Sequence, residues 1–206
     1  MLFRSPAPAP AGILLDDVTL GYDGAPVATC NLALAAGSRT VLADPSGAGK
    51  TTLVRTVCGL LAPLSGRVQV PGAGALSVQF QDTRLVEAMT AEQNVLLCSA
   101  GALSADEAHA LLAELLPEDA LVRPAAELSG GQRRRVELAR ALAHPGAAVV
   151  LDEPFASLDA GSHKAAAAFV LRHLGGRTLL VASHAPGDTE LLHAVPARLC
   201  DARGEG

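Results

Sequence analysis

Hydrophobic and polar positions follow two different patterns along this chain. Residues 12–22 and 27–35 alternate between apolar and polar side chains, which predicts two strands of a small antiparallel sheet. Later runs such as residues 147–151 are apolar without alternation, as expected of strands covered by helices on both faces. These further strands are predicted at residues 38–43, 67–70, 76–80, 147–151 and 177–182, with an edge strand around 197–200.

Longer stretches between these strands have helical character. Helices are predicted at residues 50–60, 92–100, 106–116, 130–143, 162–174 and 186–193. Strands that alternate with helices predict an α/β fold with a mostly parallel central sheet, beside which the small antiparallel sheet packs. Residues 83–126 contain predicted helices and no strand, so this segment is expected to be an all-helical insertion.

The domain organisation follows from these elements. At 206 residues one domain is the default, and we expect it to span residues 12–206. Its core is predicted at residues 12–82 and 127–200, with the helical subdomain at about 83–126. Residues 6–11 alternate Pro and Ala, and the whole of residues 1–11 is expected to form a flexible tail rather than a secretory signal.

Composition excludes several classes of protein. The net charge is −5 and aromatic residues make up 2%, which argues against a nucleic-acid partner. The longest stretch without Asp, Glu, Lys or Arg, residues 24–38, is 15 residues long and contains Pro and Asn, so no membrane span is expected. The four cysteines lack metal-ligand spacing, which favours reduced thiols in a cytosolic protein.

A glycine-rich loop lies between a predicted strand and a predicted helix. Backbone N–H groups, a helix N-terminus, a lysine and a hydroxyl for Mg²⁺ are what a triphosphate requires, and this order supplies them. Lys50 is placed to reach the β- and γ-phosphates, and the Thr51 hydroxyl to ligate the metal. The predicted nucleotide-binding residues of the loop are Asp44, Pro45, Ser46, Gly47, Ala48, Gly49, Lys50, Thr51 and Thr52.

The first position of this loop departs from the usual pattern. Phosphate loops of this type begin with Gly, whereas this chain has Asp44. Pro45 pushes the preceding residue towards extended geometry, so an L-residue is sterically feasible. A carboxylate that points towards the phosphates would, however, weaken nucleotide binding.

A pair of acids follows the apolar run 147–151. An Asp-Glu pair after a strand is usually part of a solvated loop, but a phosphate loop upstream favours a catalytic role here. Asp152 is then expected to hold the Mg²⁺ shell. Glu153 is expected to polarise an attacking water as general base.

The segment Leu-Ser-Gly-Gly-Gln-Arg-Arg-Arg-Val-Glu-Leu-Ala-Arg-Ala-Leu at residues 128–142 resembles the signature motif of the ATP-binding cassette (ABC) family. The resemblance covers about residues 13–200. It implies that Ser129, Gly130, Gly131 and Gln132 bind the γ-phosphate of a nucleotide held by a second subunit. Arg133, Arg134 and Arg135 are expected to form a mostly solvated face.

Other residues receive roles only through this resemblance. Tyr22 is similar to the aromatic residue that stacks on adenine, and Gln81 to the glutamine that touches Mg²⁺ or the attacking water. Residues 157–159 resemble the D-loop, and His184 the switch histidine that holds the γ-phosphate, while the other five histidines are expected to be incidental surface groups. The predicted catalytic residues are therefore Glu153, His184 and Lys50, and the predicted metal ligands Thr51, Gln81 and Asp152.

The resemblance implies an ATPase that uses ATP and Mg²⁺ to power a multisubunit transporter. The importers of the nitrate, sulfonate and taurine group are most similar. Implied partners are integral membrane permease subunits, a second ATPase subunit and a solute-binding protein, at the cytoplasmic face of the membrane. One alternative remains: a degenerate cassette with a regulatory or structural role, because of Asp44.

Overall fold

The computed structural model describes residues 12–71 and 76–201, so the predicted tail at residues 1–11 lies outside the described residues. Its strands are β1 (Ile13–Tyr22), β2 (Ala25–Leu34), β3 (Arg39–Leu42), β4 (Ser65–Gln69), β5 (Leu76–Gln79), β6 (Ala148–Asp152), β7 (Thr178–Ala182), β8 (Val195–Ala197) and β9 (Cys200–Asp201). Its helices are α1 (Lys50–Val57), α2 (Ala91–Cys98), α3 (Ala105–Ala113), α4 (Glu118–Leu121), the 3₁₀ turn η1 (Ala125–Glu127), α5 (Gly130–Ala143), α6 (Ala160–His173) and α7 (Asp188–Leu191).

Two sheets organise these strands. The larger has the order β5-β6-β7-β3-β8, and each pair in it is parallel. The smaller has the order β4-β1-β2-β9 and is antiparallel. The predicted α/β class, with a parallel core beside a small antiparallel sheet, is confirmed.

The C-terminal strand differs from its prediction. A single edge strand was expected around residues 197–200, but the chain crosses here from one sheet to the other. β8 pairs with β3 in the parallel sheet, and β9 pairs with β2 in the antiparallel sheet. Such a crossing depends on distant partners and leaves no local pattern. Helix α4 was also not predicted, because its four residues are too few for a helical period to show.

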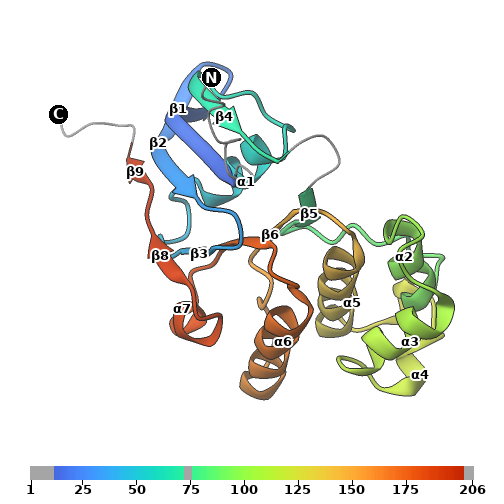
Figure 1. Cartoon of the computed structure of the whole chain (residues 1–206). Coiled ribbons are helices and arrows are strands. Elements are labelled where there is room, and N and C mark those ends of the chain that lie inside the picture. Colours follow the sequence, from blue (N-terminus) through green and yellow to red (C-terminus); the bar gives the residue numbers. More distant parts are fainter. Residues whose placement is uncertain (1–11, 72–75, 202–206) are drawn as a thin grey trace, which may run out of the picture.

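Both faces of the parallel sheet are buried at its central strands β6 and β7, in which every residue is buried. In β6, Ala148 and Val150 pack with α1 and the antiparallel sheet, whereas Val149 and Leu151 pack among α5, α6 and the helical segment. Successive residues of a strand point to opposite faces, so one apolar run serves two cores. Figure 1 shows the resulting layers, with α1 and the antiparallel sheet on one side and α5, α6 and α7 on the other.

The segment between β5 and α5 is helical, as predicted. It contains α2, α3, α4 and η1, and its only strand-like feature is an isolated bridge between Thr90 and Pro124. Figure 1 shows these helices beside α5 at one end of the molecule. Within residues 12–71 and 76–201, no helix has both the length and the apolar character needed to cross a bilayer.

Candidate functional site

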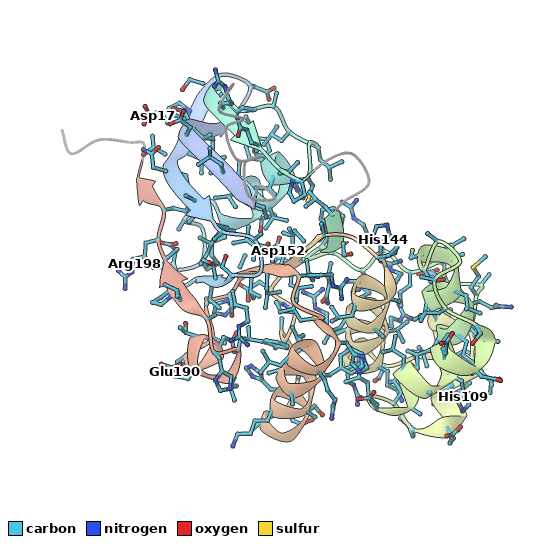
Figure 2. The ribbon with its side chains drawn as sticks, viewed as in Figure 1. Asp17, His109, His144, Asp152, Glu190 and Arg198 are labelled. Atoms are coloured by element: carbon cyan, nitrogen blue, oxygen red, sulfur yellow. The ribbon has the colours of Figure 1, made fainter. Side chains whose placement is uncertain are left out.

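Several of the predicted site residues lie at or just after the carboxyl ends of strands in the parallel sheet. The glycine-rich loop follows β3, Glu153 follows β6 and His184 follows β7, while Gln81 comes two residues after β5. Since these strands are parallel, their carboxyl ends meet at one edge of the sheet, where α/β proteins bind their ligands. Figure 2 shows Asp152, at the end of β6, near the middle of the molecule.

A pocket of about 330 Å³ opens at this edge. Its lining is Tyr22, Val27, Ser46, Gly47, Gly49, Lys50, Thr51, Thr52, Gln81 and Glu153. All of these except Val27 were predicted as site residues. Tyr22 is 38% exposed, and its hydroxyl accepts a hydrogen bond from the Thr52 hydroxyl at 3.3 Å. Tyr22 and Val27 therefore add apolar surface to a pocket whose other lining residues are mostly polar or glycine.

Two glycines shape the loop in front of α1. Gly47 and Gly49 have φ values of 82° and 101°, a region that L side chains rarely adopt. A Cβ on Gly49 would also lie 3.1 Å from Val27 Cγ1, which is too close. Within the described residues, no side chain caps the N-terminus of α1, so its first backbone N–H groups can donate hydrogen bonds to an anion.

The Lys50 ammonium is held over this loop. Lys50 is 6% exposed, and Nζ donates to the carbonyl oxygens of Asp44 and of Pro45, the latter at 2.9 Å. An ammonium has three N–H donors, so one remains for a ligand. The Lys50 ammonium therefore lies at the pocket, where it can bind a phosphate group.

Asp44 points away from the pocket. Its carboxylate is buried, and Oδ2 accepts a hydrogen bond from the Leu199 backbone N–H at 3.0 Å. Its φ is not positive, in line with the extended geometry that Pro45 requires. The structure thus assigns this side chain to the crossing between β8 and β9, whereas the sequence left its direction open.

Asp152 suits a divalent cation. The residue is 1% exposed, and among the described residues neither carboxylate oxygen has a hydrogen-bond partner. Burial raises the pKa of this carboxyl, and the nearby Thr51 hydroxyl lowers it in part. The Thr51 hydroxyl also donates to Gln81 Oε1 at 3.2 Å. A carboxylate, a hydroxyl and an amide oxygen are the hard ligands that Mg²⁺ prefers, so the three residues fit this ion.

Glu153 and His184 form a pair. Glu153 Oε1 lies 2.7 Å from His184 Nδ1, and the histidine side chain is 59% exposed. Glu153 has a φ of 49°, an unusual value for a residue with a side chain. The Glu153 N–H donates to the Ala182 carbonyl at 2.8 Å, which helps to hold this backbone. The Glu153 carboxylate therefore lines the pocket, and the His184 imidazole lies beside it.

The loop that carries His184 is anchored by a buried acid. Asp188, which is 1% exposed, accepts a hydrogen bond from the Ser183 hydroxyl and lies 2.6 Å from His163 Nε2. The His163 ring stacks on Phe155, with ring centroids 4.7 Å apart. His163 is thus not the incidental surface group expected from the sequence. It connects the His184 loop to α6 and to the segment after Glu153.

The prediction of a solvated arginine face on α5 was wrong. Arg133 donates to the carbonyls of Ala126 and Leu128, and Arg135 to those of Leu115 and Gly131. Arg134 is only 7% exposed.

The sequence contained a signal for the burial of Arg134. Arg134 and Glu137 are three residues apart, and both share a helix face with Leu138 and Ala141, which are buried. Two opposite charges at that spacing on an apolar stripe indicate a buried pair.

The signature residues do not line the pocket of their own chain. Ser129 is the N-cap of α5 and forms a capping box with Gln132, in which the Ser129 N–H donates to Gln132 Oε1 at 2.9 Å. Ser129 and Gly130 are exposed. A Cβ on Gly131 would meet Leu158 at 3.6 Å, so the helix start and the segment after Glu153 pack together.

Comparisons with known proteins agree with this architecture. Residues 27–156 match the family described as ABC transporter. An aliphatic sulfonates import ATP-binding protein of Burkholderia lata is 45% identical over 155 residues, which cover 73% of this chain and 44% of that protein. A thiamine import ATP-binding protein of Escherichia coli O157:H7 is 30% identical over 92% of this chain and 88% of its own length. The chain thus spans less than half of the sulfonate relative but most of the thiamine relative.

Solved structures are similar over nearly the whole chain. A dimeric ATP-binding cassette in a post-hydrolysis state, bound to ADP and Pi, has a TM-score of 0.81 and 25% identity, covering 92% of this chain and 94% of its own. An ABC transporter ATP-binding protein from Pyrococcus furiosus has a TM-score of 0.80 and 25% identity, covering 91% and 96%.

Replacement of Asp44 tests the direction of its side chain. Asp44→Ala removes the acceptor of the Leu199 N–H, so we expect the free energy of unfolding to fall by about 1–2 kcal/mol. Asp44→Asn keeps an acceptor oxygen and should be close to wild type in denaturant titrations. Both variants should bind ATP within about twofold of wild type, because the lost charge faces away from the phosphates. Tenfold tighter binding by Asp44→Asn would show instead that the carboxylate faces the nucleotide.

Proposed function

The chain belongs to the ABC transporter family, and on that basis we propose that it binds and hydrolyses ATP to power a membrane transporter, specifically an importer of a small solute. One observation carries the proposal. One edge of the parallel sheet holds the glycine-rich loop, the Glu153–His184 pair and the Asp152 carboxylate, which has no hydrogen-bond partner within the described part of the chain. The degenerate cassette is disfavoured, because the Asp44 carboxylate is hydrogen-bonded to Leu199 rather than facing the pocket.

The pocket suggests how ATP would lie. The adenine would stack on the exposed ring of Tyr22, with Val27 beside it. The triphosphate would run along the N–H groups of residues 46–52 towards Lys50. Thr51, Gln81 and Asp152 would hold Mg²⁺. When bound, this ion would neutralise part of the negative charge on the phosphates.

Hydrolysis would use the acid that lines this pocket. A water oxygen attacks the γ-phosphorus as the bond to the β–γ bridging oxygen breaks, and the electron pair leaves with ADP. Glu153 would accept the proton of that water, and His184 would orient the water and hold the γ-phosphate. Lys50 would stabilise the negative charge on the phosphate oxygens.

A second subunit would complete the site. Ser129, Gly130, Gly131 and Gln132 are absent from the pocket of their own chain, and the first two are exposed. We therefore place them against the γ-phosphate of a nucleotide held by another cassette. The similarity to a dimeric cassette bound to ADP and Pi supports this arrangement. Removal of the γ-phosphate would then take away the charge that holds the two subunits together.

The helical segment at residues 83–126 is the proposed contact with the membrane permease. Val86 and Leu97 are 40% and 59% exposed on this segment, and apolar side chains in water are suited to a protein partner. We treat the segment as a subdomain of a single ABC ATPase domain at residues 12–206. We also propose that the chain attaches peripherally to the cytoplasmic face of the membrane. In this proposal it works with a solute-binding protein outside the membrane and has no nucleic-acid partner. The sulfonate and thiamine relatives support import without assigning a solute.

Replacement of Glu153 tests the proposed chemistry. Glu153→Gln keeps the size of the side chain but cannot accept the proton of the attacking water. We expect the ATP hydrolysis rate to fall at least about 100-fold, while Mg²⁺-ATP binding by calorimetry is retained. Glu190→Gln, which alters an exposed acid on α7, should hydrolyse ATP like wild type. An unchanged rate in Glu153→Gln would remove Glu153 from its role.

Replacement of Ser129 tests the second half-site. In the Glu153→Gln background, ATP should drive the chain into a dimer that sedimentation detects. Adding Ser129→Arg should block this dimer by its bulk while ATP still binds to the monomer. Ala113→Arg on the exposed side of α3 serves as control and should leave the dimer intact. A dimer that persists in the Ser129→Arg variant would contradict the proposed placement.

A further inference from the structure

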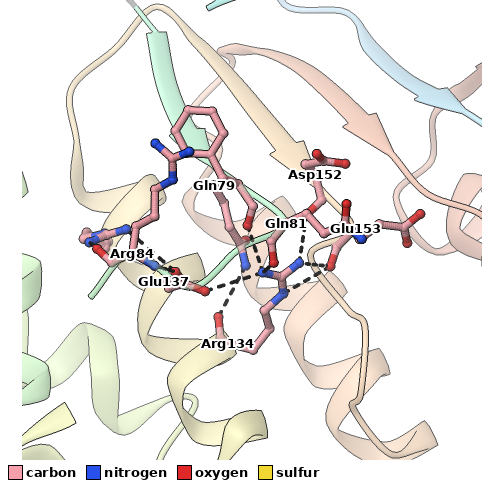
Figure 3. A network of polar contacts seen from close by, with 9 residues as sticks. Gln79, Gln81, Arg84, Arg134, Glu137, Asp152 and Glu153 are labelled. Carbon is pink, nitrogen blue, oxygen red and sulfur yellow. Dashed lines mark hydrogen bonds and ion pairs between the residues drawn. The ribbon is translucent and has the colours of Figure 1, made fainter. Parts of the chain in front are cut away.

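One guanidinium joins two segments of the site that are distant in sequence. Arg134 Nη1 donates to the carbonyl oxygens of Phe80 and Gln81, at 2.9 and 3.0 Å. Nη2 donates to the carbonyl of Asp152 at 2.8 Å and to that of Glu153, and Nε donates to the same Glu153 oxygen at 3.1 Å. Figure 3 shows Arg134 between the two segments. Three of these four carbonyls belong to residues that the proposed function uses.

Arginine is suited to this position by its geometry. Its planar fork presents five N–H donors in fixed directions, so one side chain can reach carbonyls on both sides. The carbonyls lie just beyond the end of β5 and at the end of β6, where sheet pairing stops. Arg134 thus supplies these carbonyls with hydrogen-bond donors, as a neighbouring strand would, and so fixes the spacing of the two segments.

The charge of Arg134 is balanced within the same helix. Glu137 is 1% exposed, and its Oε2 lies 3.5 Å from Arg134 Nη1. Its other oxygen accepts a hydrogen bond from the Arg84 N–H at 2.6 Å. Gln79 Nε2 donates to the Arg134 carbonyl at 3.5 Å, and the Arg84 guanidinium lies 4.1 Å from the centre of the Phe80 ring. Residues 79, 80, 81 and 84 are therefore hydrogen-bonded to α5.

We propose that Arg134, with Glu137 as its counter-ion, is a positioning residue for ATP hydrolysis. It sets the separation of Gln81 from Glu153 and ties both to α5, the helix that begins at the signature residues. When a second nucleotide engages the start of α5, both segments move with the helix as one unit. This inference rests on the proposed ATPase function.

The arrangement implies a specific kinetic effect. Among the described residues, no hydrogen bond joins the Arg134 side chain to the loop at residues 44–52, so the contacts of this loop with a nucleotide do not depend on Arg134. The geometry of Glu153 and Gln81 does depend on it. Misplacement of a reacting group by about 1 Å can cost on the order of 100-fold in rate. Loss of Arg134 therefore acts on kcat rather than on KM.

The test compares two arginines that each donate to several backbone carbonyls, the buried Arg134 and the half-buried Arg177. Arg134→Lys keeps the charge but cannot reach both segments at once. Its matched control is Arg177→Lys, since Arg177 also donates to several backbone carbonyls, among them those of His144 and Leu174, but at the opposite edge of the sheet before β7. Arg134→Lys should lower kcat at least about tenfold with KM for ATP changed less than about threefold. Arg177→Lys should lower Tm while kcat stays within about twofold of wild type, measured well below Tm.

Amide hydrogen exchange gives a readout that does not depend on activity. Exchange at residues 80–84 and 152–156 should speed up in Arg134→Lys and not in Arg177→Lys. If Arg134→Lys does not fold, Glu137→Gln replaces it, because its amide oxygen can still accept from Arg84 while the charge is lost. That variant should also lower kcat, by a smaller factor than Arg134→Lys, and should speed up amide exchange at residues 80–84.

The outcomes separate the two proposals. Equal kcat losses in both arginine variants, or unchanged exchange at the two segments, would overturn the positioning role. A wild-type chain that hydrolyses no ATP would contradict the proposed function instead. In that case, faster exchange confined to Arg134→Lys would still support the role of Arg134 in holding the segments, and equal exchange in both variants would overturn it.

Discussion

The parallel pairing of β3, β7 and β6 is the constraint on which the candidate site depends. Parallel strands place their carboxyl ends at one edge, and the loops that follow them carry Lys50, His184 and Glu153. The pairing persists because both faces of the sheet are covered, by α1 and the antiparallel sheet on one side and by α5 and α6 on the other. Without these two cores the proposed catalytic groups would have no common position.

Polar groups buried at this edge divide into two kinds. Arg134 and Glu137 satisfy one another, and Arg134 also satisfies the backbone carbonyls around it, so these contacts join the ends of β5 and β6 to α5. The Asp152 carboxylate has no hydrogen-bond partner among the described residues, although burial makes an unpaired charge costly. The first arrangement is complete without a ligand. An unpaired buried carboxylate such as that of Asp152 is expected where a cation binds. This contrast supports the proposed division between positioning and binding groups.

The proposed division of labour also explains why the signature residues lie outside the pocket. Ser129 and Gln132 satisfy each other in a capping box, so α5 begins in a defined way without help from a nucleotide. The exposed start of α5 can then meet another molecule, while Arg134, one turn further on, touches the backbone of Gln81 and Glu153. A single helix thus connects a proposed contact surface to the proposed chemistry.

The sequence by itself determined the fold class, most of the strands and helices, and the glycine-rich loop and the acidic pair of the site, because these depend on local signals. Tyr22 and Gln81 were assigned only through a family resemblance, and Val27 of the pocket was not predicted. Apolar runs mark buried strands, and the glycines before Lys50 mark a turn that only glycine adopts easily. The roles of these residues remain proposals. Only the tertiary structure decided where Asp44 points, how the chain crosses between β8 and β9, and what Arg134 holds. Asp44 is 155 residues from its partner Leu199, and Arg134 holds carbonyls that lie 18 to 54 residues away. A local pattern carries no information about such partners.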